Sequence, residues 1–301
     1  MKHIYIQDVM ARDGLQIEDQ FMPTEQKIDL INRLSNSGVD KIEVTSFVSP
    51  KAVPNLRDAE DVMTGIDRKD GTVYAALVPN VKGAERAVAC GTDEINLVVS
   101  ASETHNQKNV RRTVNESFAD FQKVANHLSG TGIKINGSLA TSFGCPFEGK
   151  VEDDRVLNLV EDYLELGADG ITLADTTGMA TPKQVNRLTT EILDRWPDVP
   201  LTLHFHNTRG MGLANVMEAI RAGAVRFDAS LGGLGGCPFA PGATGNICTE
   251  DLVHMLVFMG YQMNADLDLL LAASKKLGTA LGHDVPGQVV KAGKITDLHA
   301  V

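Results

Sequence analysis

The sequence lacks the features of several protein classes. It has no run of about 18 apolar residues, so no membrane-spanning helix is expected. The start, MKHIYIQDVMARDG, lacks the apolar run of a signal peptide, and the end, DLHAV, is not a recognised targeting signal. No Cys-x-x-Cys pair occurs among Cys90, Cys145, Cys237 and Cys248, which disfavours a thiolate zinc knuckle or a thioredoxin-type motif. We therefore expect a cytoplasmic protein with reduced thiols.

An excess of positive charge is also absent. The formal net charge is -11 and the isoelectric point is about 5.2, which argues against nucleic acid or an anionic membrane as the main partner. An anionic substrate is still allowed, because a local basic pocket can sit in an acidic protein. The 301 residues are 43% hydrophobic and 22% charged, so the chain can bury a large core.

Short β-rich runs alternate with helical patterns along the whole chain. In TEQKIDLINRLSNSG, Ile28, Ile31 and Leu34 recur on one face, Thr24 is placed to cap the start, and Gly38 is placed to end the helix. The β-rich runs cover residues 3–9, 40–46, 72–78, 93–99, 133–139, 170–175, 201–206 and 225–230. Alternating βα units predict a parallel sheet.

A weak internal repeat supports the same fold. Gly38, Gly91, Gly167 and Gly223 each end a helical pattern and lead into the second, fourth, sixth or eighth run. Eight units in about 250 residues favour an α/β fold of the (β/α)8 TIM-barrel type. A doubly wound open sheet is the alternative, weakened because no Gly-x-Gly-x-x-Gly follows the first run. We predict one catalytic domain over 1–301, with the barrel at about 1–262 and a C-terminal helical extension at 263–301.

In such a barrel, the chemistry belongs at the carboxyl ends of the strands. His204 and His206 end the seventh run, and a spacing of two places both imidazoles on one face of a strand. Paired in this way they favour a divalent-metal site over two hydrogen-bonded polar core residues.

Two charged residues end the first run. Asp13 offers a hard oxygen to a metal, and Arg12 offers a fixed cation for a developing anion. Glu43, late in the second run, is placed to orient the metal water or Arg12. Its alternative role is a buried partner for Lys41 or Arg12.

The stretch GGLGGCPFAPGATGN follows the eighth run and ends at Asn246. It matches neither the Walker spacing nor the dinucleotide fingerprint, so we expect its glycines to act as hinges of a loop that closes over substrate. The amide oxygen of Asn246 would complete a ligand set without thiolate, which suits Mg²⁺ or Mn²⁺ better than zinc. Cys237 lies within this loop, where a thiol can serve as an acid or base or simply pack as a small apolar residue. Cys145, in GCPF, is a weaker candidate.

With these residues in view, the chain resembles the 3-hydroxy-3-methylglutaryl-CoA lyase family of metal-dependent TIM-barrel lyases. The resemblance is carried in order by RDGLQ, EVTSFVSPKAVP, LVPNVKG, GCPFEGKV, ADTTGMATP, HFHNTRGMGLAN, the glycine loop and TEDLVHML. It covers most of the predicted barrel.

The resemblance implies a retro-Claisen cleavage of a 3-hydroxy-3-alkyl acyl-CoA, giving acetyl-CoA and, in the type reaction of leucine catabolism, acetoacetate. One Mg²⁺ or Mn²⁺ would bind the substrate's hydroxyl and distal carboxylate. The implied metal ligands are Asp13, His204, His206 and Asn246. The implied catalytic residues are Arg12 for the enolate, Cys237 as general acid, and Glu43 and Asp175 to position these groups. The implied substrate-binding residues are Gln16, Asp8 and Thr176.

Two stretches depart from the animal enzymes of the family. Ile17 and Asp19 replace a polar and a basic residue, and HFHNTRG replaces HCHDTYG. The implied partners are an acyl-CoA and other copies of the chain, as a dimer or tetramer. Two alternatives stay open: a sister lyase acting on citramalyl-CoA or a longer branched glutaryl-CoA, and a non-catalytic barrel that only binds acyl-CoA.

Overall fold

A computed structural model describes residues 2–236 and 245–298. Eight parallel strands form a closed barrel in sequence order, which confirms the predicted TIM barrel and excludes the open sheet. The strands are β1 (Tyr5–Asp8), β2 (Lys41–Ser46), β3 (Val73–Leu77), β4 (Glu94–Ser100), β5 (Lys134–Ala140), β6 (Gly170–Asp175), β7 (Leu201–Phe205) and β8 (Arg226–Ala229). Each strand pairs with the next, and β8 closes the barrel on β1.

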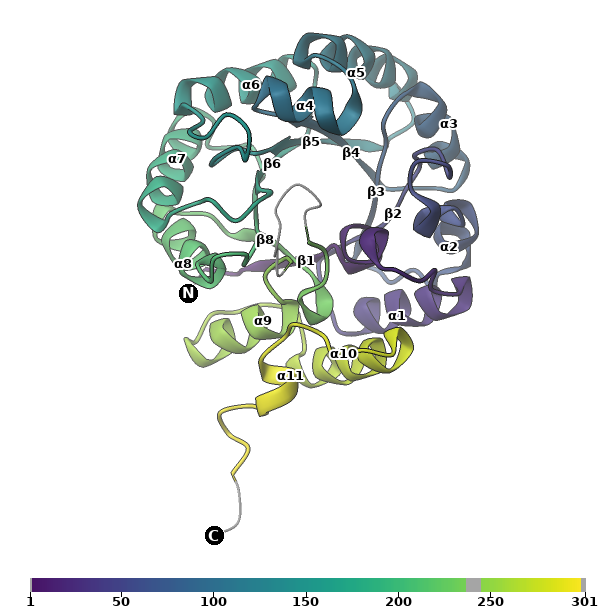
Figure 1. Cartoon of the computed structure of the whole chain (residues 1–301), viewed down its shortest axis with the longest axis vertical. Coiled ribbons are helices and arrows are strands. Elements are labelled where there is room, and N and C mark those ends of the chain that lie inside the picture. Colours follow the sequence, from purple (N-terminus) through teal and green to yellow (C-terminus); the bar gives the residue numbers. More distant parts are fainter. Residues whose placement is uncertain (1, 237–244, 299–301) are drawn as a thin grey trace.

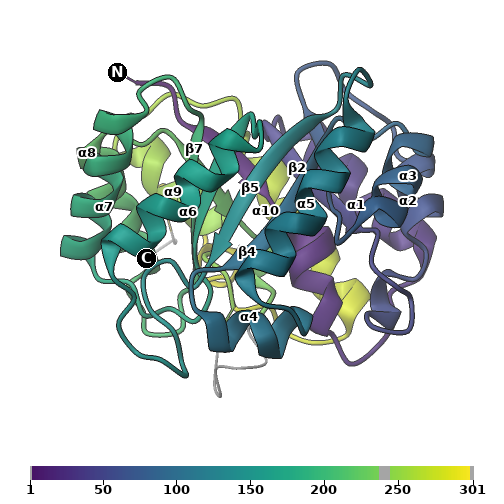
Figure 2. The same cartoon turned by 90° about the horizontal axis from the view of Figure 1, so that it is seen from above.

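Helices surround the barrel as an outer ring (Figure 1). They are α1 (Thr24–Asn36), α2 (Ala59–Gly65), α3 (Val81–Ala89), α4 (Glu103–Val110), α5 (Val114–Leu128), α6 (Asp153–Glu165), α7 (Pro182–Arg195), α8 (Gly212–Ala222) and α9 (Thr249–Phe258). Figure 2 shows α4 beyond the strand ends, on the opposite face from the amino terminus. No helix among the described residues is long and apolar enough to cross a membrane.

The predicted C-terminal helices are present as α10 (Leu267–Leu281) and the short α11 (Val289–Ala292). Helix α10 packs against α1 and α9, on one side of the barrel, and the chain beyond α11 extends away from the body (Figure 1).

The start of α1 differs from the prediction. The N-cap position is occupied by Pro23, and no side chain caps the helix. Thr24 is the first helical residue, and its hydroxyl donates to Asp58 Oδ2 at 2.8 Å. The prediction that Thr24 caps α1 is therefore wrong. The four repeat glycines, Gly38, Gly91, Gly167 and Gly223, have φ between +68° and +114°, as expected for residues that end helices.

The hydrophobic core is a layer between the strands and the helices. On β4, Ile95, Leu97 and Val99 are fully buried, while the alternating Glu94 and Asn96 are only partly buried. A small cavity is lined by residues of six strands, namely Gln7, Asp8, Lys41, Glu43, Asn96, Asn136, Thr172 and Asp228, together with Val9. The barrel interior is therefore polar here, whereas branched apolar residues dominate it in most TIM barrels.

Candidate active site

The first site element is a π-helical turn, η1 (Met10–Gly14), directly after β1. The Val9 carbonyl accepts hydrogen bonds from the backbone N–H of Asp13 at 2.7 Å and of Gly14 at 3.3 Å. Such wide turns are frequent at functional sites. This one places the Arg12 and Asp13 side chains at the carboxyl end of the barrel.

Two imidazoles meet Asp13 at this end. His204 Nε2 and His206 Nε2 lie 3.1 Å apart, and His206 Nε2 lies 3.9 Å from Asp13 Oδ2. One ligand atom from each of the three residues lies within 4.8 Å of the other two. Both histidines are more than nine-tenths buried. The fold thus brings together three of the four predicted metal ligands.

The protonation of the pair suits a cation. Burial and, after it, the neighbouring His204 together lower the pKa of His206 to about 3, so His206 presents a lone pair. Burial also opposes charge on His204, but the hydrogen bond and charge of Asp228 outweigh it and raise the pKa of His204. Asp228 Oδ2 lies 3.2 Å from His204 Nδ1, the arrangement that directs the other ring nitrogen of a metal-ligating histidine toward the metal. Two imidazoles and a carboxylate that converge in this way fit a divalent cation.

Asn246 anchors the glycine loop to this cluster. It forms an isolated β-bridge with His206, and its Nδ2 donates to Asp13 Oδ2 at 2.7 Å and to the Leu234 carbonyl at 2.9 Å. Gly235 has φ +95°, and a Cβ there would lie 2.7 Å from Asn246 Nδ2 and 2.9 Å from the Asp13 carbonyl oxygen. Only glycine therefore lets the chain pass here. The Asn246 side chain reaches the site, where its amide nitrogen, and not its amide oxygen, is hydrogen-bonded to Asp13. Cys237 lies outside the described residues.

Arg12 is held by two carboxylates. Its Nε donates to Glu43 Oε2 at 2.5 Å, and its Nη1 donates to Asp13 Oδ1 at 2.7 Å. Burial opposes the charge, but Glu43 and Asp13 outweigh it, so the pKa of Arg12 is raised. Nη2 makes no hydrogen bond to a described residue, and the side chain is 14% exposed. The guanidinium is thus fixed, permanently charged and able to donate to a bound anion.

The remaining predicted residues divide into two groups. Gln16 joins the cluster, because its Nε2 donates to Asp13 Oδ1 at 3.1 Å. Asp175 ends β6, and its Oδ1 accepts from the backbone N–H of Met179 at 2.7 Å and of Ala180 at 3.0 Å. Its Oδ2 is buried without a partner among the described residues, and burial raises the pKa of Asp175 to about 6.

Thr176 and Asp8 are not tied to the cluster. Thr176 Oγ1 accepts from the Thr141 backbone N–H at 2.9 Å. The Asp8 carboxylate is fully buried behind η1, where it accepts from Thr249 Oγ1 at 2.6 Å and from the Met10 N–H at 2.9 Å. Burial raises the pKa of Asp8 to about 7. These contacts tie Asp8 to η1 and α9, and its role as a substrate contact stays a prediction.

Sequence analysis missed Asp228, which contacts His204. A signal was available, because an aspartate stands within the otherwise β-rich run VRFDAS. Its inward direction follows only from the register, in which His204 of β7 pairs with Asp228 of β8.

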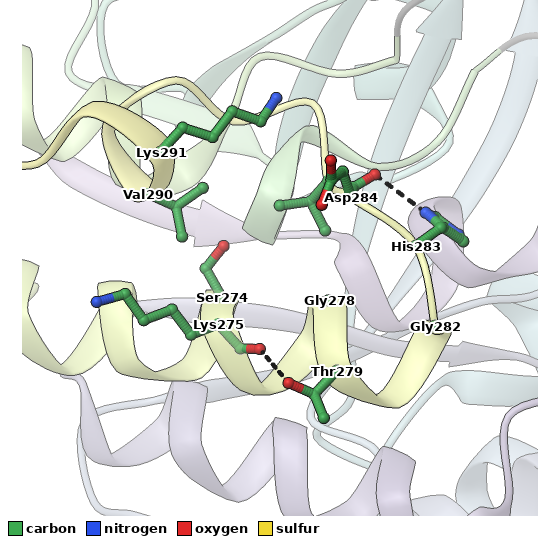
Figure 3. Close-up of a pocket in the computed structure, with 10 residues that line it drawn as sticks. Ser274, Lys275, Gly278, Thr279, Gly282, His283, Asp284, Val290 and Lys291 are labelled. Atoms are coloured by element: carbon green, nitrogen blue, oxygen red, sulfur yellow. Dashed lines mark hydrogen bonds between the residues drawn. The ribbon is translucent and has the colours of Figure 1, made fainter.

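A separate groove of about 410 Å³ lies outside the cluster, between α10 and the segment 282–291 (Figure 3). Lys275 of α10 and Lys291 of α11 both line it, together with His283. His283 Nε2 bonds Glu18 Oε2 at 2.8 Å, and Glu18 directly follows the turn that carries Gln16. The groove therefore opens on the same rim as the site.

Comparison with known proteins assigns the family. The HMGL-like family model matches residues 3–277. The chain belongs to the HMGL-like family. The resemblance drawn from the motifs is confirmed, and the chain is a carbon–carbon lyase.

Named relatives span almost the whole chain. Hydroxymethylglutaryl-CoA lyase YngG of Bacillus subtilis is 44% identical over 293 residues, covering 97% of this chain and 98% of the relative. (R)-citramalyl-CoA lyase of Chloroflexus aurantiacus is 42% identical, with 98% and 96% covered. A solved HMG-CoA lyase of Acinetobacter baumannii, in complex with coenzyme A and 3-methylmalate, is 56% identical with a TM-score of 0.95, covering 99% of this chain and 98% of that one.

Proposed function

We propose that this protein cleaves 3-hydroxy-3-methylglutaryl-CoA to acetyl-CoA and acetoacetate in the cytoplasm. The observation that carries the proposal is the fixed Arg12 guanidinium beside the converging Asp13, His204 and His206, at the carboxyl end of a barrel shared with lyases of that name. A cationic donor and a metal-ligand set in contact are what a retro-Claisen reaction needs, since one end of the substrate must lose a proton while the other gains negative charge.

The reaction balances without an added oxidant or reductant. The 3-hydroxyl loses its proton, a ketone forms at C3, the C2–C3 bond breaks, and its electron pair passes to C2 as the thioester enolate. A proton then adds to C2 to give acetyl-CoA. The proposed metal ligands are Asp13, His204, His206 and Asn246. Asn246 would bind through its amide oxygen, after the amide turns from the orientation in which its nitrogen donates to Asp13. When bound there, Mg²⁺ or Mn²⁺ supplies Lewis acidity that lowers the pKa of a coordinated hydroxyl.

The chain's own groups supply the rest. Arg12 donates to the thioester oxygen as negative charge develops, and Glu43 holds the guanidinium in place. Asp175, with a pKa of about 6 and an unpartnered Oδ2 among the described residues, is our candidate acceptor for the hydroxyl proton. Gln16 and Thr176 stay proposed substrate contacts. Cys237, beyond the described residues, stays our proposed acid for protonating C2.

A second substrate is favoured by specific observations. The relative named (R)-citramalyl-CoA lyase is nearly as similar as hydroxymethylglutaryl-CoA lyase YngG. The solved structure that is 56% identical holds 3-methylmalate, a positional isomer of citramalate with the same four-carbon diacid chain. Citramalyl-CoA is one methylene shorter than 3-hydroxy-3-methylglutaryl-CoA. A difference of one methylene changes the ratio of kcat/KM values for two substrates by only about 10- to 200-fold. The same cleavage of this substrate would release acetyl-CoA and a 2-oxo acid.

A Mg²⁺-dependent cleavage assay with products identified by mass tests both proposals. The panel holds 3-hydroxy-3-methylglutaryl-CoA, citramalyl-CoA and a longer branched glutaryl-CoA. We expect the highest kcat/KM for the first compound. Faster turnover of citramalyl-CoA by more than tenfold would assign the chain to the sister lyase. No cleavage of any compound, with metal bound, would favour an acyl-CoA-binding barrel.

We place the phosphates of coenzyme A at the groove between α10 and α11. Its lysines supply positive charge in an acidic chain, and no acidic side chain pairs with either Lys275 or Lys291 among the described residues. The groove shares the rim of the active site through His283 and Glu18. It can therefore receive the distal part of a substrate whose acyl end lies at Arg12.

We also propose that the protein forms a homo-oligomer through its C-terminal region. Of the eight large apolar side chains exposed among the described residues, six lie there: Val257, Phe258, Met259, Leu269, Ile295 and Leu298. A His254 ring nitrogen accepts from the Ile295 N–H and its ring contacts Phe258, so part of this set forms one surface. Residues 257–298 carry four lysines and four aspartates, so two copies can face each other there without net repulsion.

Light scattering coupled to size exclusion measures this assembly. The doubly substituted Phe258→Asp, Ile295→Asp variant should be monomeric. Ile17→Asp, which makes the same kind of substitution once at an exposed site elsewhere, should keep the wild-type mass. A monomeric wild type, or an unchanged mass in the double variant, would contradict the proposal.

A further inference from the structure

A chain of amide groups crosses the inside of the barrel and ends on Glu43. Asn96 Nδ2 of β4 donates to Glu43 Oε1 of β2 at 2.7 Å. Asn136 Nδ2 of β5 donates to Asn96 Oδ1 at 3.0 Å and also contacts Thr172 Oγ1 of β6 at 2.9 Å. Four side chains from four strands thus form one hydrogen-bonded row.

The direction of this row is fixed. An ionised carboxylate only accepts hydrogen bonds, so Asn96 must turn its nitrogen to Glu43 and its oxygen to Asn136. Asn136 and Asn96 are direct partners in the β4–β5 register. Between β2 and β4, the residue paired with Glu43 is Ala75 of β3, whose small side chain leaves the space in which Glu43 and Asn96 meet.

Glu43 connects the row to the reactive cation. Its Oε1 binds Asn96, while its Oε2 accepts from Arg12 Nε at 2.5 Å. Glu43 is 2% exposed, and the adjoining cavity of about 10 Å³ holds at most one water molecule. Without Asn96, Oε1 would lose its protein donor in a buried site, and the carboxylate would be free to rotate away from Arg12.

We propose that Asn96, supported by Asn136, is a positioning residue that fixes the Arg12 guanidinium through Glu43. The kinetic part of this inference rests on the proposed function, because it needs turnover of an acyl-CoA. Asn96→Ala should lower kcat about 10- to 100-fold, the size of effect that a small misplacement of a reacting group produces. The KM for the acyl-CoA should stay within about threefold.

Tyr163→Phe is the matched control. The Tyr163 hydroxyl is buried on the outer face of the same strands and donates to the Leu97 carbonyl of β4 at 2.7 Å. Its removal costs a buried hydrogen bond to β4 but leaves the row intact. We expect a lower midpoint of thermal unfolding with kcat within twofold of wild type. An equal fall in kcat for both variants would show that Asn96 acts only through stability.

Asn96→Asp should change the pH dependence of kcat, which a purely structural role of Asn96 would leave unaltered. A protonated Asp at this position can donate to Glu43 Oε1, as the amide does, whereas its ionised form places two carboxylates together. Arg12, Lys41, Glu94 and Asp228 are the other charged groups of the barrel interior, and all are unchanged in this variant. Its kcat relative to wild type should therefore fall as pH rises from 6 to 9. A ratio that does not change with pH would overturn the proposal.

A double-mutant cycle tests whether Asn96 acts on Arg12 through Glu43. If Asn96 acts through Glu43, adding Asn96→Ala to Glu43→Ala should change kcat by less than about twofold, far from additive. Additive losses would place Asn96 on a separate path and refute the inference.

A spectroscopic measurement separates this inference from the proposed function. In protein with ¹⁵N-labelled arginine, the Nε–H signal of Arg12 is assigned by its loss in Arg12→Lys. Asn96→Ala should shift this signal and speed its exchange with solvent, and Tyr163→Phe should not. If wild type cleaves no acyl-CoA, the proposed function fails, and the Arg12 Nε–H signal alone tests whether Asn96 positions the guanidinium. An unchanged signal in Asn96→Ala overturns the positioning role.

Discussion

The buried Asp8 carboxylate gives a pH dependence of stability that can be calculated. Asp8 has no basic partner among the described residues. It accepts hydrogen bonds from the Thr249 hydroxyl and the Met10 N–H, the Leu231 backbone N–H also favours its ionised form, and Glu250 lies nearby. Burial raises its pKa from 3.8 to about 7. The folded state therefore binds the proton more tightly than the unfolded state. This contribution is fully present below about pH 4 and is lost as pH rises through about 7.

The size follows from the shift. Each pKa unit corresponds to about 1.4 kcal/mol, so ionised Asp8 lowers the free energy of unfolding by roughly 4 kcal/mol at pH 9, as an upper bound. Asp8→Asn keeps the shape and removes the charge: its Oδ1 can accept from Met10, and its Nδ2 can donate to Thr249. Because the unfolded carboxyl is already ionised above about pH 4, we expect the stability of the variant relative to wild type to increase by roughly 3 kcal/mol between pH 5 and pH 9.

Urea unfolding followed by circular dichroism between pH 5 and pH 9 measures this difference. The comparison at pH 5 is the internal reference, because the folded wild-type carboxyl still holds its proton there. Parallel stability profiles for wild type and Asp8→Asn would refute the reasoning, since they would show that Asp8 does not change its charge on folding. A variant less stable at pH 9 than wild type would show that the ionised form has a favourable partner.

Four further predictions concern the active site. Cys237→Ala should lower kcat about 10²- to 10⁴-fold, the usual contribution of a general acid, while calorimetry shows unchanged Mn²⁺ binding; full activity would remove the thiol from the reaction. Arg12→Lys should lower kcat about 10²- to 10³-fold, because a single ammonium nitrogen cannot reproduce the planar fork whose separate nitrogens reach Glu43, Asp13 and an enolate. A change confined to KM would contradict this. Asp228→Ala should weaken Mn²⁺ binding about 10- to 100-fold, because His204 Nδ1 loses the partner that orients its ring. Titration calorimetry measures this affinity, and an unchanged value would show that Asp228 does not orient His204. Lys275→Glu should raise the KM for acyl-CoA with kcat unchanged, and an unchanged KM would move the phosphates elsewhere.

The fold was predictable because β-rich runs and amphipathic helical patterns alternate regularly along the chain. Each strand run is short and β-rich, and each ends where a polar or glycine-containing stretch begins. Because parallel strands of a barrel end on one face, residues as far apart as Asp13 and His204 could be placed together before any coordinates were known. The same rule placed Arg12 beside Glu43, and the two are in contact; whether Glu43 orients Arg12 for chemistry or is only its buried partner stays a prediction.

The missed features depend on long-range geometry. The hydrogen bonds of Asp228 and Asn96 follow from strand register and from the small Ala75, neither of which a single strand reveals. At α1, the capping pattern was outweighed by a tertiary partner, because the Thr24 hydroxyl donates to Asp58. The orientation of the Asn246 amide is set by the backbone carbonyl of Leu234. Such details are decided by packing between elements.

The polar interior of this barrel has a consequence for how its sequence can change. Alternate residues of a strand face opposite sides, so on β4 Ile95, Leu97 and Val99 serve the hydrophobic layer while Glu94 and Asn96 serve the interior. The two sets share no side chain. Substitutions at odd-numbered positions of β4 should therefore be selected for stability, and those at even-numbered positions for chemistry. A lineage of this protein can thus change the charges beneath Arg12 by replacing inward-facing residues, without repacking the layer that keeps the barrel folded.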